Sequence, residues 1–170
     1  MNFTDREWWT LLHGMGFGAV FLLGFAGGLA GLYSLRPGLL TPSGVTERIR
    51  RLKIGVVAMA VAAWGTVITG TWVVYPWYRD PATDSPKSLL LADPNTADWH
   101  EFGMEWKEHI AWISPILATV VAFIVVYYGT NLIRHDRVRR TAMTLFVLSF
   151  AFAGVAGAFG AFITKVAPVS

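Results

Sequence analysis

The stretch from Trp8 to Leu35 reads WWTLLHGMGFGAVFLLGFAGGLAGLYSL and carries no formal charge over 28 residues. A membrane-spanning helix needs roughly 20 predominantly apolar residues, so this stretch is long enough to cross a bilayer. The ionisable side chain of His13 lies in its first third, beside Gly14, Gly16 and Gly18. An ionisable group inside a membrane span indicates a functional site with a partner elsewhere in the chain.

Three more apolar stretches follow, and the composition agrees with them. The chain is 54% hydrophobic with a mean hydropathy of +0.48, and its charges are confined to short intervals. These features predict an all-α, polytopic membrane four-helix bundle, a single domain over residues 1–170. The expected spans are residues 8–35, 54–78, 110–133 and 141–164. The first is not expected to be a cleaved signal peptide, because acids precede it and it is too long.

The segment between the second and third spans, residues 79–109, is the only sizeable part expected outside the membrane. Three prolines predict an irregular first half, and a helix is expected to begin near Thr96 or Asp98. Pro76 is expected to mark the end of the second span. Pro115 removes a backbone hydrogen bond to Ala111 and is expected to bend the third.

The basic residues predict how the bundle is oriented. We call the end expected to hold the N-terminus side A and the opposite end side B. Side A carries Arg6, Arg79, Lys87, Lys107 and Lys165 with nine acids, and side B carries Arg36, Arg48, Arg50, Arg51, Lys53, Arg134, Arg137, Arg139 and Arg140 with only Glu47 and Asp136. The positive-inside rule therefore predicts a cytoplasmic (inner) membrane protein with side B inside and both termini outside.

Other protein classes are excluded by composition. The chain has no cysteine, which excludes disulfides, thiolate metal sites and a covalently attached c-type haem. The net charge of +3 does not predict nucleic-acid binding, because the basic residues border membrane spans, where topology explains them.

Two of the four histidines are expected to lie at one depth. His13 is about five residues inside the first span and His109 is at the mouth of the third, and both spans run inward from side A. In a sequentially wound bundle these two helices are diagonal. Two imidazoles at one depth on facing helices are what a haem clasped by two histidines requires. His100 is the second choice for the second iron ligand, whereas His135 belongs to side B.

Glycines near this depth would make room for a haem b. Gly16, Gly70 and Gly157 thin three of the helices, and small residues let a backbone or a macrocycle come close. The alternative is that the glycines only pack helices, as Gly24-x-x-x-Gly28 and Gly27-x-x-x-Gly31 are expected to do. Candidate partners for the haem propionates are Arg79, Lys107, Lys165, Tyr75 and Tyr78.

With its two histidines, nearby glycines and aromatic rims, the chain resembles the small membrane-anchored b-type cytochromes. The resemblance covers the architecture and rests on His13 and His109. It implies one haem b near the extracytoplasmic face and electron exchange with a c-type cytochrome, a similar carrier, or another membrane or periplasmic subunit. The acidic 79–109 segment would steer a basic carrier. It implies an electron-transfer subunit with no catalysis of its own.

Two other functions fit the sequence. The first is a non-redox membrane scaffold whose glycine-rich faces dock other subunits and whose histidines are structural. The second is a metal site on the outer face, built from His100 with Asp98, Glu101, Glu105 or His109. Mixed nitrogen and oxygen ligands of that kind suit zinc or copper.

Overall fold

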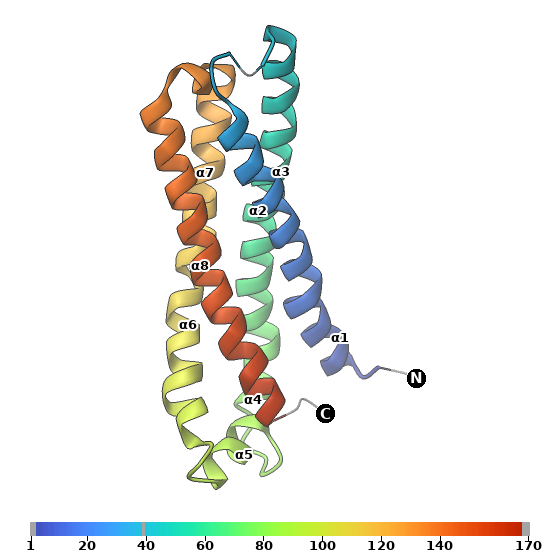
Figure 1. Ribbon diagram of the computed structural model, residues 1–170. Helices are drawn as coiled ribbons and strands as arrows, with labels where there is room; N and C mark the ends of the chain where they lie inside the picture. The colour runs from blue at the N-terminus through green and yellow to red at the C-terminus, as the bar shows by residue number, and fades with distance from the viewer. Residues whose placement is uncertain (1–2, 39, 168–170) are drawn as a thin grey trace.

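The computed structural model describes residues 3–38 and 40–167, and it forms an all-α bundle of four long apolar helical spans (Figure 1). The spans are Asp5–Ser34, Pro42–Tyr78, Trp99–Arg134 and Asp136–Val166. Each has at least 30 residues, more than the roughly 20 that a bilayer requires. This confirms the predicted class of a multi-pass membrane helical protein. Asp5 and Val166 lie at the same end of the bundle, side A.

Each of the first three spans is interrupted, and the fourth is continuous. The first consists of α1 (Asp5–Leu11), the π-helical turn η1 (Leu12–Gly16) and α2 (Phe17–Ser34). The second consists of α3 (Pro42–Thr69), the π-helical turn η2 (Gly70–Val74) and α4 (Tyr75–Tyr78). After α5 (Pro86–Ala92), the third consists of the π-helical turn η3 (Trp99–Met104), α6 (Glu105–Ala111), α7 (Ile113–Tyr128) and the 3-10 turn η4 (Gly129–Arg134). The fourth is α8 (Asp136–Val166).

The helix starts follow from side chains that satisfy free backbone N–H groups. Thr4 and Glu7 form a reciprocal capping box at α1. Thr41 accepts a bond from the Gly44 N–H at α3, and Pro42 occupies the first turn, where its missing N–H costs nothing. As a result α3 begins twelve residues before the apolar run at Ile54, so a charged helical extension projects from side B.

Ser85 and Pro86 start a helix in the same way within the segment between the second and third spans. Ser85 accepts a bond from the Ser88 N–H, and α5 follows over Pro86–Ala92. The first half of this segment is therefore partly helical, where the sequence predicted irregular chain. The helix of the third span begins at Trp99, next to the predicted start.

Prolines determine where two spans are interrupted. Trp112 separates α6 from α7, three residues before Pro115, because the proline ring crowds the Ala111 carbonyl and supplies no N–H to it. The helix is interrupted at the place where the bend was predicted. Pro76 does not end its span at once: α4 continues to Tyr78, directly after the π-helical turn η2.

The side-B half of the bundle is held by close packing at glycines. A Cβ on Gly24 would lie 2.9 Å from Met59 Cβ, and one on Gly28 would lie 2.7 Å from the Phe146 ring. Gly31 is packed against Leu52. Lipid tails are as apolar as these side chains, so such close contacts hold membrane helices together. Gly27 is different, since it is exposed and nothing lies within 4 Å of its Cβ position. The expectation that it packs helices is wrong.

Polar side chains bridge the other spans. The Ser149 hydroxyl donates to the Ser114 carbonyl at 2.9 Å and joins α8 to α7. The Trp64 indole donates to Thr119 Oγ1 at 3.0 Å and joins α3 to α7. These bonds join the second, third and fourth spans, and α1 lies apart from α8 at side A (Figure 1).

Candidate functional site

The side-A third of the bundle contains all three π-helical turns of the described residues. η1 contains His13, η3 contains His100, and η2 begins at Gly70, which packs against His13. A single π-helical turn inside an α-helix is frequently found at a functional site, because the extra residue re-aims side chains. The π-helical turns therefore indicate His13 and His100 as candidate functional residues.

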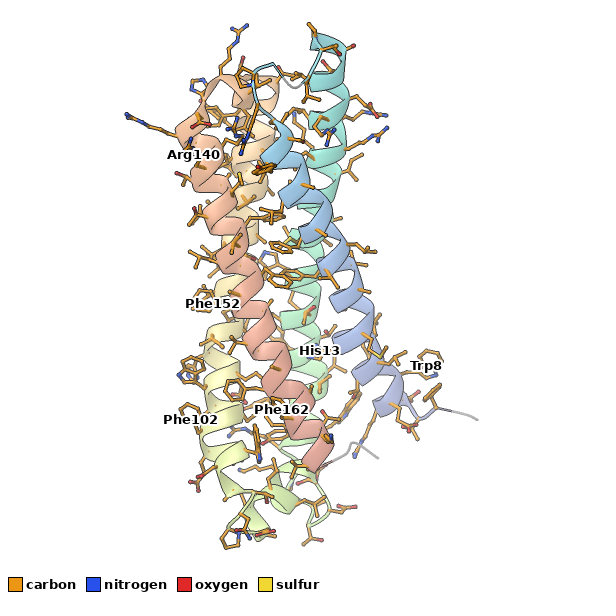
Figure 2. The ribbon with its side chains drawn as sticks, in the orientation of Figure 1. Trp8, His13, Phe102, Arg140, Phe152 and Phe162 are labelled. Carbon is orange, nitrogen blue, oxygen red and sulfur yellow. The ribbon has the colours of Figure 1, made fainter. Side chains whose placement is uncertain are left out.

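The His13 ring is held between α1 and α3 (Figure 2). Its Nδ1 lies 3.2 Å from Thr69 Oγ1, and the Thr69 hydroxyl donates to the Gly65 carbonyl at 2.7 Å. Because the Thr69 proton is already used, Thr69 accepts the bond and His13 Nδ1 carries the hydrogen. The lone pair of the neutral imidazole is therefore on Nε2. Such a fixed tautomer is typical of metal-ligating histidines.

Gly70 supplies the room for this ring. A Cβ on Gly70 would lie 2.7 Å from His13 Cε1 and 3.5 Å from Nε2, so any side chain there would displace the imidazole. Gly157 borders open space on α8, with nothing within 4 Å of its Cβ position. A Cβ on Gly16 would meet only the Leu12 side chain and the Leu11 carbonyl of its own span. Of the three predicted glycines, Gly70 is the one that contacts a candidate ligand.

His109 does not face His13. It is exposed, and its Nδ1 donates to the Glu105 carbonyl of its own helix at 2.6 Å. It follows Trp106 by three residues and therefore shares the face of that ring, which is also exposed. Phe102, one turn before Trp106, lies at the outer edge of the bundle, on the far side from α1 (Figure 2). The structure thus does not bring the two predicted iron ligands together.

The side chain of Lys107, rather than that of His109, lies on the inner face of α6. Its Cε lies 3.2 Å from the Cβ position of Gly160 on α8. Among the described residues no carboxylate lies within ion-pair distance of it. Residues 107 and 109 are about 200° apart around a helix, which explains why one points inward and the other outward.

Arg79, another of the predicted propionate partners, is already paired. It donates to Glu105, lies 3.8 Å from Glu108 Oε1, and stacks 4.8 Å from the centroid of the Tyr75 ring. Burial disfavours its charge, but Tyr75 and the two carboxylates outweigh that effect and raise the pKa of Arg79. Arg79 therefore ties the end of the second span to α6.

His100 is buried, and its Nδ1 lies 2.8 Å from the Tyr78 hydroxyl. Tyr78 is eight residues beyond Gly70 on one span, roughly 12 Å along the axis, so His100 and His13 occupy different levels. In the described part of the chain no group of three or more His, Asp or Glu side chains could hold a metal ion. The predicted outer-face metal site does not form, because Glu105 is bound to Arg79 and His100 to Tyr78.

The pairs Tyr78–His100 and Arg79–Glu105 were missed by the sequence reasoning. Glu105 and Glu108 are three residues apart, on one face of a helix, opposite the one arginine that closes the second span. That spacing is the signal that could have predicted an interhelical ion pair. No protein-family model, curated protein or solved structure matches this chain.

Proposed function

We propose that this protein is a membrane-anchored, electron-transfer subunit that binds one haem b at side A, with His13 as an axial ligand to the iron. The observation that carries the proposal is the His13 imidazole, whose Nδ1–H is fixed by Thr69 in the notch at Gly70. The lone pair on Nε2 is left to bind a metal. A neutral imidazole with its other nitrogen hydrogen-bonded is the usual axial ligand of haem proteins.

The surroundings of His13 suit a large flat ligand. α1 lies apart from α8 at side A (Figure 1). Gly154 and Gly157 on α8 have nothing within 4 Å of their Cβ positions. A haem propionate is the kind of anion that a guanidinium or ammonium group at side A would bind.

His109 is the second axial ligand that we propose. Its Nδ1 is likewise hydrogen-bonded, in this case to the Glu105 backbone carbonyl, which leaves Nε2 as the ligand atom. To reach the iron, α6 has to turn by roughly half a revolution about its axis, which would carry Lys107 outward and leave Arg79 to bind a propionate. This seven-residue helix lies between the π-helical turn η3 and the break at Trp112, so it can turn without α7. Haem binding is therefore expected to release Arg79 from Glu105.

Electrons would pass to or from a c-type cytochrome or another periplasmic or membrane subunit. Asp84, Asp93, Asp98 and Glu101 are exposed at side A, whereas Glu105 pairs with Arg79. These four acids are the surface that would attract a basic carrier. The excess of Lys and Arg at side B supports a cytoplasmic-membrane location with side A outward.

A non-redox scaffold is the second candidate, and the outward direction of His109 favours it. His109 follows the exposed rings of Phe102 and Trp106, which form an aromatic face that another membrane subunit could cover. In that case His13 is a structural histidine that joins two spans.

The optical spectrum of the purified protein distinguishes the two functions. Produced in a haem-replete host, the protein is expected to show reduced-minus-oxidised α and Soret bands at one haem per chain. His109→Ala should remove the low-spin signature of two nitrogen ligands. A colourless protein that co-purifies with other subunits would instead establish the scaffold.

A further inference from the structure

A cleft at side B lies between the end of α2 and the start of α8. It has a volume of about 620 Å³ and is lined by Arg36, Pro37, Asp136, Arg139, Arg140 and Met143. Three guanidinium groups and one carboxylate give this lining a net charge of +2. It lies at the opposite end of the bundle from His13, so it is independent of the proposed haem site.

Arg139 lines the cleft and is 95% buried. Its guanidinium donates to the Leu35 carbonyl, at the open end of α2, and to the Asp136 carboxylate. Its Nε–H has no acceptor among the described residues. A buried donor without a partner is unusual, and a charged one is costly. An anion seated against this guanidinium would offset that cost.

The two other arginines stand at the mouth of the cleft and are accessible. Arg36 stacks 4.1 Å from the centroid of the Tyr33 ring, and among the described residues it has no carboxylate partner. Arg140 is exposed and shares Asp136 with Arg139, at 2.7 Å from Asp136 Oδ2. One carboxylate therefore serves two arginines, while Arg36 is left to bind an anion from outside the chain.

The position of the cleft indicates which anion it takes. Tyr33 is an exposed aromatic side chain at the end of the first span, which is where such rings mark the boundary between lipid and water. Met143 lines the cleft on α8, and the exposed side chains of Val147 and Leu148 follow about one turn further along this helix, where acyl chains would lie. Basic pockets between membrane helices at the cytoplasmic face bind anionic headgroups. We propose that this cleft binds the phosphodiester headgroup of an anionic glycerophospholipid.

The test uses delipidated full-length protein in detergent, with phosphatidylglycerol or phosphatidylcholine added, and native mass spectrometry to count bound lipid. Phosphatidylglycerol is expected to bind and phosphatidylcholine to bind much more weakly. The double variant Arg36→Gln/Arg140→Gln should lose roughly tenfold or more in phosphatidylglycerol affinity. The control Arg134→Gln/Arg137→Gln removes the same charge from exposed residues that do not line the cleft. It should change the affinity less than twofold.

Three results would overturn the proposal. The first is equal binding of the two lipids, and the second is an equal loss of affinity in both double variants, which would indicate only a diffuse positive surface. The third is competition by inorganic phosphate at millimolar concentration, which would assign the cleft to a soluble anion.

Discussion

Gly70 lies so close to the His13 ring that a side chain at this position would clash with it. A Cβ would lie 2.7 Å from Cε1 of the ring, and Gly70→Ala is therefore expected to push the imidazole away from Thr69. We predict a loss of most of the haem, because disturbing the groups that orient a metal ligand typically costs 10- to 100-fold in affinity. The ratio of Soret absorbance to protein absorbance measures the haem content.

Gly55→Ala is the matched control for this change. Gly55 lies on the same span, and nothing is within 4 Å of its Cβ position. Its haem content should equal that of the unchanged protein. Equal haem in the Gly70→Ala protein would contradict the arrangement described for His13.

His13 could be singled out from the sequence, whereas the direction of His109 could not. An ionisable side chain in a charge-free stretch of 28 residues is conspicuous. Two residues at the same depth can still point in any direction around their helices, because successive residues of an α-helix are rotated by about 100° about its axis. The π-helical turn η3 and the break at Trp112 change that direction on both sides of α6. Hydropathy predicts neither the π-helical turn nor the break.

Gly24 is a point where α2 packs closely against α3, and its substitution tests the contact between these two helices. A Cβ there would lie 2.9 Å from Met59 Cβ and 3.1 Å from the Gly55 carbonyl oxygen, which is backbone and cannot rotate away. Gly24→Ala is expected to destabilise the protein by about 1–3 kcal/mol, as overpacking does. Thermal unfolding in detergent, followed by circular dichroism, measures the loss.

Gly27→Ala provides the comparison one helical turn away. Gly27 is exposed with nothing near its Cβ position, so alanine should be neutral or raise stability by up to about 1 kcal/mol through its higher helix propensity. If both variants unfold at the same temperature, glycine packing does not join these helices.

The number and approximate extent of the spans could be predicted, because long apolar stretches are unambiguous. The start of α3 at Pro42 could not be predicted from hydropathy, since this extension is charged. Within it the Glu47 carboxylate binds Arg50 at 3.0 Å and Arg51 at 2.7 Å. Such pairs three and four residues apart support a helix in water but add nothing to an apolar signal.

The orientation of the whole molecule can be measured with cysteines, because the chain has none. Asp84 at side A and Arg50 at side B are both exposed. We predict that a membrane-impermeant maleimide labels Asp84→Cys from the outside of cells and labels Arg50→Cys only in inverted membrane vesicles. The reverse pattern would place side A in the cytoplasm and remove the periplasmic carrier from the proposed function.

The haem content of the His13→Ala protein tests the proposed function most directly. His135→Ala is the matched control, since His135 is exposed at side B and packs only against Tyr128 among the described aromatic rings. The reduced-minus-oxidised spectrum should show no α or Soret band for His13→Ala, and bands of full intensity for His135→Ala. Full bands in the His13→Ala protein, or none in the unchanged protein, would contradict the assignment of His13 as the ligand of a haem.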